Sequence, residues 1–175
     1  MIYKENPLLT ALVGDVTSKT DKRIEFFGVC DELGCHLMKV RNLIQCYRDA
    51  TEKFEVEDDL LWLVKTLSTI MSEVAGSKVA LEEKELERLY ERMESLNVKF
   101  EKFTLPGETL LSSDIHIARC VSRRCELAYA KLWEEDTEHK FTSKVVFQFL
   151  NKISTYLYNL ARYFEVIVFD NLQGD

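Results

Sequence analysis

The chain has 175 residues, of which 46% are hydrophobic and 11% aromatic, so it can bury the core of one domain. Its net charge of −7 argues against nucleic acid as a general partner, because a phosphate backbone requires a basic surface. Only two prolines and six glycines are present, and this scarcity favours long helices over a fold built on turns.

The sequence also limits where the protein works. No apolar run reaches the roughly 18 residues that a membrane-spanning helix needs, and the N-terminus lacks the basic-then-apolar pattern of a signal peptide. The five cysteines show no C-x-x-C spacing, and most occupy helical positions that we expect to face inward. We interpret them as small buried hydrophobic residues in a reducing cytoplasm. A zinc site is not expected, and none of the three histidines follows a glutamate at the Glu-x-x-His spacing of di-iron bundles.

Residues 1–20 have no periodic pattern, and we expect an irregular loop or a short extended arm there. Asp21 can cap a first helix that should run from about residue 23 to 48. Gly28 and Gly34 interrupt the apolar pattern of this helix, which suggests the close approach of another backbone or of a ligand.

Apolar residues at helical spacing predict four further helices, at about residues 54–75, 81–98, 109–135 and 142–168. Gly76-Ser77 should end the second helix, and Pro106-Gly107 marks a turn before the fourth. No segment alternates as a strand would. The pattern therefore predicts an all-α, five-helix bundle with up-down packing over residues 21–169, preceded by the arm and followed by a short tail at 170–175.

The fourth predicted helix carries a charged row on one face. At about 100° per residue, Arg119, Arg123 and Glu126 fall within one narrow stripe, with His116 at its edge and apolar residues on the opposite arc. Such spacing most often indicates surface ion pairs worth a few tenths of a kcal/mol. A row of guanidinium groups also suits phosphate oxygens, because each group can donate two parallel hydrogen bonds.

Two other residues could serve either structure or ligand binding. Phe103 is an aromatic residue on a connector, where a core contact is the more common role. Asn151 lies among core positions of the fifth predicted helix, and an interior asparagine needs hydrogen-bond partners. The sequence contains no Walker-type phosphate loop and no local signature of a serine or cysteine nucleophile.

Four stretches match one family in order and spacing. Residues 26–33 (FFGVCDEL) contain a Gly-x-x-Asp-Glu-Leu helix start, and residues 103–107 (FTLPG) contain Phe-x-Leu-Pro-Gly. Residues 116–126 (HIARCVSRRCE) follow an Arg-x-x-x-Arg-Arg-Ala-Glu pattern, and residues 149–157 (FLNKISTYL) follow Leu-Asn-Arg-Leu-Ser. From about residue 19 onward the chain resembles the trimeric ATP:cob(I)alamin adenosyltransferases of the propanediol-utilisation type.

This resemblance implies a homotrimer that binds ATP and Mg²⁺ at a subunit interface. Cobalt(I) of a corrinoid, cobalamin, would attack the 5′ carbon of ATP and release triphosphate. By the matching positions, the ATP-binding residues would be Lys19, Arg123, Arg124, Glu126 and Asn151. The cations would stabilise charge on the departing triphosphate, with Arg123 acting in catalysis.

The resemblance implies two further roles. Asp31 would pair with Arg119 across subunits, and Phe103 would act in catalysis by facing the lower side of the corrin and displacing its axial ligand. A corrinoid reductase would be a candidate partner, because the reaction consumes cobalt(I).

The N-terminal segment departs from the family pattern. The family opens with Thr-x-x-Gly-Asp-x-Gly-x-Thr, a loop whose N–H groups and hydroxyls wrap the triphosphate. Counting back from Lys19, residues 3–9 (YKENPLL) stand in that place; Pro7 lacks a donor and Glu5 would repel phosphate. The first hypothesis is therefore an adenosyltransferase, active or weak. The alternative is a non-catalytic relative that binds corrinoid or nucleotide as a carrier or regulatory subunit, and a plain helical scaffold is a remote third.

Overall fold

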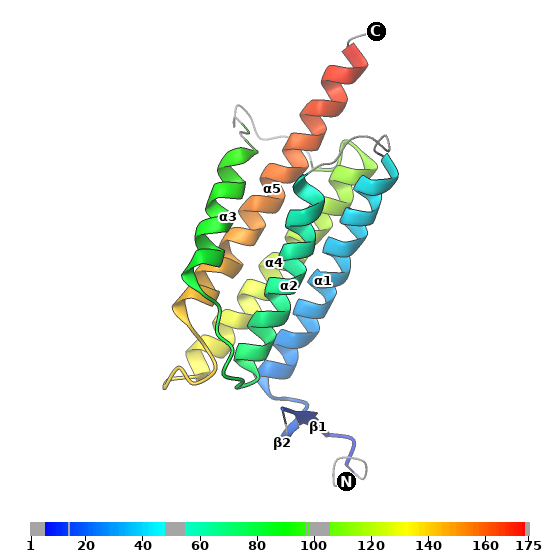
Figure 1. Cartoon of the computed structure of the whole chain (residues 1–175). Coiled ribbons are helices and arrows are strands. Elements are labelled where there is room, and N and C mark those ends of the chain that lie inside the picture. Colours follow the sequence, from blue (N-terminus) through cyan, green and yellow to red (C-terminus); the bar gives the residue numbers. More distant parts are fainter. Residues whose placement is uncertain (1–5, 14, 48–54, 97, 99–105, 174–175) are drawn as a thin grey trace.

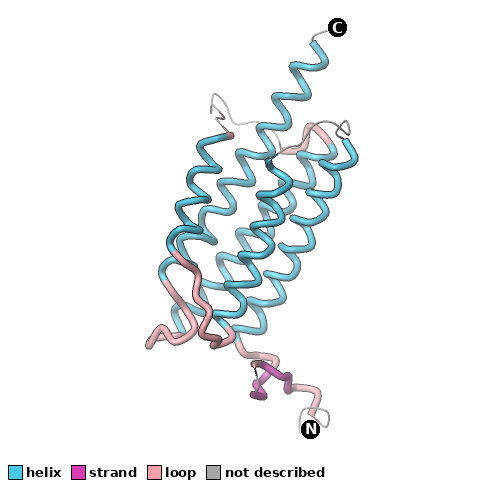
Figure 2. Tube along the Cα trace, viewed as in Figure 1, coloured by secondary structure: helices cyan, strands magenta, loops and turns pink. Residues whose placement is uncertain are grey.

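The computed structural model describes residues 6–13, 15–47, 55–96, 98 and 106–173 of the chain. These residues form two strands and five helices: β1 (Leu9–Leu12), β2 (Asp15–Ser18), α1 (Lys22–Tyr47), α2 (Glu55–Val74), α3 (Glu83–Ser95), α4 (Leu110–Glu135) and α5 (Lys144–Gln173). The helices run alternately up and down the bundle (Figures 1 and 2), as predicted. No described helix combines the length and apolar character needed to cross a membrane.

The N-terminal arm contains regular structure that the sequence did not predict. β1 and β2 form an antiparallel hairpin in which Leu9 lies opposite Ser18 and Leu12 opposite Asp15. The backbone N–H of Lys19 donates to the carbonyl of Leu8 and extends the pairing (2.8 Å). Each strand has only four residues, too few for an alternating pattern to be recognised. An irregular loop is therefore wrong for residues 9–12 and 15–18, whereas the other alternative, a short extended arm, agrees with the two strands.

The helix ends use the caps that the sequence signals. The Asp21 carboxylate accepts from the backbone N–H of Arg23 (2.9 Å) and binds its guanidinium, which lowers the pKa of Asp21 to about 2. At the end of α2, Gly76 adopts φ of 91°, and the Ser77 N–H donates to the carbonyl of Ser72. Thr109 forms a reciprocal capping box at the start of α4.

The core lies between α1, α2, α4 and α5, and α3 packs on the outside. α4 is in contact with both α1 and α5, whereas α3 packs mainly against α5. Four aromatic side chains are completely buried at the centre: Phe26, Tyr129, Phe149 and Tyr156. Burial of such large side chains contributes roughly 1.5–3 kcal/mol each. To be buried together, the apolar residues of a helix must lie on one face, and this is why the apolar periodicity of the sequence predicted the helices.

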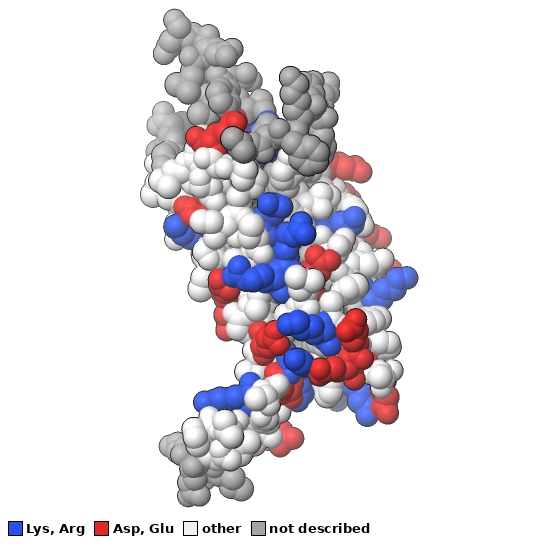
Figure 3. Space-filling view, turned by 180° about the vertical axis from the view of Figure 1, so that it is seen from behind, with Lys and Arg blue, Asp and Glu red and all other residues white. Residues whose placement is uncertain are grey.

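Three ion pairs, spaced seven residues apart on α1, join α1 to α4. They are Glu25–Lys131 (2.9 Å), Glu32–Arg124 (2.6 Å) and Lys39–Asp114 (2.7 Å). The Glu25–Lys131 and Glu32–Arg124 pairs are exposed and contribute little stability, whereas the Asp114 side chain is only 6% exposed. The order of the three pairs shows that the two helices run antiparallel and in which register. Seen from behind, the side on which α4 lies, cationic and acidic side chains are interspersed over the bundle (Figure 3).

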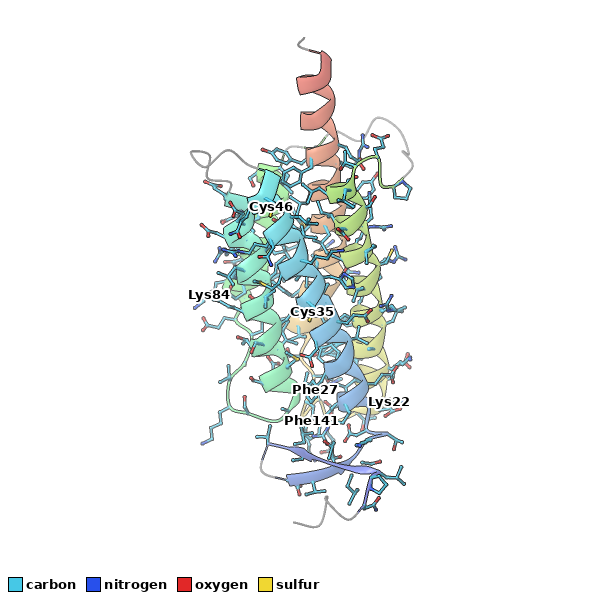
Figure 4. All side chains as sticks on the ribbon, turned by 90° about the vertical axis from the view of Figure 1, so that its right-hand side faces the viewer. Lys22, Phe27, Cys35, Cys46, Lys84 and Phe141 are labelled. Atoms are coloured by element: carbon cyan, nitrogen blue, oxygen red, sulfur yellow. The ribbon has the colours of Figure 1, made fainter. Side chains whose placement is uncertain are left out.

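The cysteines are only partly as predicted. Cys30 and Cys125 are buried between α1 and α4, with their sulfur atoms 3.3 Å apart, and burial raises the pKa of the Cys30 thiol well above its ordinary value. Cys35, Cys46 and Cys120 are exposed, so the prediction that most cysteines face inward is wrong. Figure 4 shows Cys35 and Cys46 on α1, whose outer face also carries Gly28.

The glycines of α1 have no packing explanation within the described chain. A Cβ atom added at Gly28 or Gly34 would meet no atom within 4 Å. The close approach predicted at these positions is therefore not made by another described part of the same chain.

A buried carboxylate joins three helices. Asp59 of α2 is 3% exposed and accepts hydrogen bonds from Arg92 of α3 (2.7 Å to Nε) and from the Tyr156 hydroxyl of α5 (3.1 Å). Arg92 also binds the carboxylate of Glu55, whose side chain is 80% exposed. Two acidic residues thus hold the same guanidinium in very different surroundings.

We expect Asp59→Ala to lower the free energy of unfolding by about 3–5 kcal/mol, because it leaves the Arg92 charge and the Tyr156 hydroxyl without their buried acceptor. Urea denaturation measures this loss. Glu55→Ala is the matched control and should cost less than about 1 kcal/mol, because an exposed pair contributes little. Equal losses in the two variants would contradict the central role of Asp59.

Candidate functional site

The two adjacent arginines of α4 point to different neighbours. Arg123 is exposed, and no described residue forms a hydrogen bond or ion pair with it. Arg124 lies on the α1 side and donates from Nη2 to Glu32 Oε1 at 2.6 Å. Both side chains of that pair are about half exposed, at 53% and 46%. Arg123 therefore remains uncommitted within the described chain, while Arg124 has an exchangeable surface partner.

Two predicted site residues meet between α4 and α5. The Asn151 carboxamide donates from Nδ2 to Glu126 Oε1 at 2.7 Å. Asn151 is exposed, so the prediction that it occupies an interior position is wrong. Phe149 and Leu150 face the core, and one further step of about 100° along the helix turns Asn151 outward. Its hydrogen-bond partner is thus another candidate residue at the surface.

Arg119 and His116 also belong to α4, and their side chains lie nearer the interior of the bundle. Arg119 is partly buried, its guanidinium carbon is 6.0 Å from the Tyr158 ring centroid, and its Nε is buried without a hydrogen-bond partner among described residues. His116 is only 7% exposed; its Nε2 lies 3.8 Å from Glu165 Oε1, and its Nδ1 is likewise unpartnered. His116, which lies at the edge of the charged row, is therefore part of a buried polar cluster.

Residues of α5 complete this cluster, and the sequence analysis missed them. Arg162 binds Glu165, which is 1% exposed, through Nη1 and Oε2. Asn151, Tyr158 and Arg162 fall within a narrow stripe at about 100° per residue, so the helical spacing used for α4 could have identified them. Glu165 was less accessible to this reasoning, because an acidic residue near a helix end is normally solvated.

The surroundings of His116 favour its neutral form. Burial is the largest influence and lowers the pKa of His116 below its ordinary value of 6.5, and the positive charges of Arg119 and Arg162 lower it further. The Glu165 carboxylate acts in the opposite direction but does not outweigh them. At pH 7 the imidazole is therefore neutral, with one nitrogen that donates and one that accepts.

A cleft of about 380 Å³ lies between α1 and α4. Glu32 and His36 line it from α1, His116, Arg119 and Arg124 from α4, and Gly107 at its end. Gly107 has φ of 93°, and an added Cβ atom would lie 2.7 Å from the Ser113 hydroxyl, so a glycine is required at this position. The cleft brings two members of the predicted site, Arg119 and Arg124, to one wall.

The remaining predicted residues are not brought together by the described chain. Phe103 lies outside the described residues. Lys19 is exposed at the end of the hairpin and Asp31 on the outer face of α1. Arg124 lies level with Glu32, about 15 Å along α1 from the helix start that follows Lys19. Among the described residues, no group of three or more His, Cys, Asp or Glu side chains could hold a metal ion.

Curated relatives support the resemblance found in the sequence. A corrinoid adenosyltransferase from Citrobacter freundii is 28% identical over 164 residues, which is 87% of either chain. One from Bacillus subtilis is 27% identical over 164 residues, covering 87% of this chain and 79% of the relative. The corrinoid adenosyltransferase PduO of Salmonella typhimurium is 26% identical over 156 residues, or 85% of this chain, and the chain spans only 44% of that relative's length.

Solved structures share the fold. A variant of the PduO-type ATP:corrinoid adenosyltransferase from Lactobacillus reuteri, complexed with cobalamin and ATP, superposes with a TM-score of 0.77. It is 23% identical, and the match covers 93% of this chain and 92% of that chain. Another variant of that enzyme, complexed with ATP, also has a TM-score of 0.77 at 24% identity, covering 93% of each chain. These likenesses confirm the helical fold.

A family model described as cobalamin adenosyltransferase matches residues 9–164. The match includes α1 to α4 in full, most of α5 and the hairpin, and it spans all four sequence motifs. The resemblance inferred from those motifs is confirmed. The chain belongs to the cobalamin adenosyltransferase family.

Proposed function

We propose that the protein is a corrinoid adenosyltransferase that transfers the 5′-deoxyadenosyl group of ATP to cob(I)alamin. Cobalt(I) provides the electron pair for the new cobalt–carbon bond while the bond from C5′ to the phosphate oxygen breaks, and triphosphate leaves. The observation that carries this proposal is the family match over residues 9–164. The charged row of α4 is the part of the described chain best suited to the anionic leaving group.

Arg123 and Arg124 bind the triphosphate in this proposal. Arg123 supports it by being exposed and free of partners among the described residues, so its guanidinium can meet a phosphate without first losing an ion pair. Arg124 would exchange Glu32 for phosphate at small cost, since their pair is about half exposed. Positive charge held where negative charge develops lowers the barrier to departure of the leaving group, and this is the catalytic role of Arg123.

Glu126 and Asn151 hold the nucleotide beside these cations. Their hydrogen bond of 2.7 Å joins α4 to α5 and limits the rotation of the Asn151 carboxamide. A carboxamide restrained in this way loses less freedom when it binds the nucleotide. Lys19 would reach the phosphates from the hairpin. Lys19 and Arg124 of one chain lie far apart along the bundle axis. We therefore infer that a triphosphate site containing both residues takes Lys19 from one copy of the chain and Arg124 from another.

The family resemblance implies a homotrimer, and two observations support contact between copies of the chain. The buried Nε of Arg119 has no acceptor within the part of the chain that the structure describes, and Asp31 is exposed on α1. We infer that Asp31 of one protomer binds Arg119 of the next. The empty space beside Gly28, on the same outer face of α1, fits the close approach of another chain.

The remaining reactants are assigned by family membership. Mg²⁺ would arrive as the counter-ion of ATP, since the described residues offer no cluster suited to a protein-held metal. Phe103 would face the corrin and exclude an axial ligand, because an apolar ring offers cobalt no lone pair. A corrinoid reductase in the cytoplasm would supply the electron that generates cobalt(I).

One observation favours a second candidate function, a non-catalytic relative that binds corrinoid or nucleotide. The family match begins at residue 9, and residues 3–9 lack the threonines and glycines of the family's phosphate loop. Loss of three charge-assisted hydrogen bonds, at roughly 1.5–3 kcal/mol each, would weaken ATP binding by several orders of magnitude.

Incubation of the purified protein with chemically reduced cobalamin, ATP and Mg²⁺ distinguishes these functions. Formation of adenosylcobalamin, followed by its absorbance spectrum, supports the transferase. Binding of ATP or cobalamin without turnover, measured by calorimetry, supports the non-catalytic relative. Neither binding nor turnover would leave only a helical scaffold.

In an active protein, Arg123→Ala should lower kcat/KM at least about 100-fold, because it removes a cation that stabilises the leaving triphosphate. Steady-state kinetics measures the loss, and circular dichroism should show unchanged helical content. Lys131→Ala is the control: Lys131 is an exposed cation further along α4 that pairs with Glu25. Unchanged activity of Arg123→Ala would remove this residue from the site.

Arg119→Ala should weaken assembly of the trimer, because breaking a buried ion pair costs about 3–5 kcal/mol. Sedimentation velocity over a range of protein concentrations measures the effect, and Asp31→Ala should reproduce it. Exchange of the two charges, Asp31→Arg together with Arg119→Asp, should restore part of the assembly. An unaltered trimer in Arg119→Ala would contradict the interface role.

A further inference from the structure

Lys19 lies in a tight turn that joins β2 to α1 and is fixed at both ends. The Asp21 backbone N–H donates to the Ser18 carbonyl across the turn (3.0 Å). The Lys19 N–H donates to the carbonyl of Leu8 and so ties the turn to the hairpin (2.8 Å). The hydroxyls of Ser18 and Thr20 share a hydrogen bond of 2.8 Å. The backbone of Lys19 is therefore held, while its side chain is exposed.

A side-chain contact joins the hairpin to the cap of α1. The Thr17 hydroxyl, on β2, donates to Asp21 Oδ2 at 2.8 Å. The other oxygen of that carboxylate, Oδ1, accepts from the Arg23 backbone N–H at the start of α1 (2.9 Å). One carboxylate thus holds the end of the strand and the first turn of the helix in a single arrangement.

The Arg23 side chain restrains the same carboxylate. Its guanidinium donates from Nε to Asp21 Oδ1 (3.0 Å) and from Nη2 to Oδ2 (2.6 Å), and this two-pronged contact fixes the plane of the carboxylate. The side-chain hydrogen bond from Arg23 has the largest effect on the pKa of Asp21, which is lowered to about 2, so the pair stays ionised at neutral pH. The side chains of Arg23 and Asp21 are only 18% and 21% exposed, so solvent and salt screen this pair less than the surface pairs of α1 and α4.

The turn between α4 and α5 connects Arg23 to the bundle. The guanidinium carbon of Arg23 lies 4.5 Å from the centroid of the Phe141 ring. Phe141 is itself fixed, because its N–H donates to Asp136 Oδ2 (2.7 Å) and its ring lies 3.5 Å from the place of a Cβ atom on Gly76. Figure 4 shows Phe141 at the end of the bundle next to the hairpin. The contacts therefore run without a break from the bundle through Arg23 to the hairpin.

We propose that Thr17, Asp21 and Arg23 are positioning residues that hold Lys19 at a fixed place beside the end of the bundle. A side chain on a fixed backbone loses less freedom when it binds an anion than one on a flexible arm. This restraint gains importance because residues 3–9 lack the donors of the family's phosphate loop, so that Lys19 carries more of the contact with phosphate. That the anion is a triphosphate shared with a second copy rests on the proposed function.

Amide hydrogen exchange, followed by NMR on the full chain, tests the restraint without any ligand. Thr17→Val removes the hydroxyl and leaves Asp21 and Arg23 together. We expect the Lys19 N–H to exchange about tenfold faster, because a hydrogen bond to a charged group is lost and the hairpin opens more easily. Thr17→Ser keeps the hydroxyl and should restore slow exchange. Thr10→Val is the matched control, because Thr10 lies opposite Thr17 in the hairpin and its hydroxyl has no hydrogen-bond partner among the described residues.

Arg23→Lys and Arg23→Met test the next contact. Lysine keeps the positive charge but lacks the planar fork, so it holds the Asp21 carboxylate less firmly. The Lys19 N–H should exchange faster in Arg23→Lys, and faster still in Arg23→Met, which also removes the charge. Exchange in Arg23→Met equal to that of the unaltered chain would remove Arg23 from the positioning residues.

Calorimetric titration with tripolyphosphate measures the consequence for binding. Thr17→Val should weaken binding by up to about tenfold, whereas Thr17→Ser should leave it unchanged. In a Lys19→Gln background, Thr17→Val should cause no further loss, because a positioning residue acts only through the group that it positions. A purely structural role of Thr17 would weaken binding equally in both backgrounds.

These measurements separate the positioning role from the proposed function. Unchanged exchange of the Lys19 N–H in Thr17→Val, or an equal loss of tripolyphosphate binding with and without Lys19, would overturn the positioning role. Faster exchange, together with tripolyphosphate binding that Lys19→Gln leaves unaltered, would uphold the restraint and overturn the assignment of Lys19 to phosphate. Circular dichroism spectra identical to that of the unaltered chain show that neither result comes from unfolding.

Discussion

The packing of α4 between α1 and α5 is the constraint on which the candidate site depends. One arc of α4 is buried in the core, so the remaining side chains must face α1, α5 or solvent. Arg124 faces α1 and pairs with Glu32, whereas Glu126 faces α5 and pairs with Asn151. Arg123 lies between these directions and stays exposed. A rotation of α4 by one residue would redistribute all three side chains, so burial of the apolar arc also sets the polar chemistry.

The polar groups beside this helix carry more positive than negative charge. Arg162 binds the buried carboxylate of Glu165, the neutral His116 lies beside it, and the Nε of Arg119 has no hydrogen-bond partner among the described residues. A partly buried guanidinium with an unpaired nitrogen is costly unless something outside the described chain completes it. The assembly proposed through Asp31 would give Arg119 an acceptor that the described residues of one chain do not provide.

The fold and the proposed activity would depend on different parts of this chain. The bundle is held together mainly by the buried faces of its helices, and the family match covers residues 9–164. Binding of triphosphate would depend in addition on backbone donors of a loop that residues 3–9 replace with a different composition. An apolar core tolerates sequence divergence as long as volume and pattern are kept, whereas a phosphate site loses affinity with each missing donor. The family fold is therefore compatible with either strong or weak catalysis.

The sequence by itself determined the five helices, their caps at Asp21 and Gly76, and the charged stripe of α4, because helical period and capping chemistry act within a few residues along the chain. Only the tertiary structure decided that Asn151 is exposed, that Arg124 binds Glu32 and that Cys35 faces outward. It also revealed the hairpin and the buried cluster around Glu165. These features depend on how neighbouring helices are rotated and on pairings between distant residues, and no local pattern encodes either.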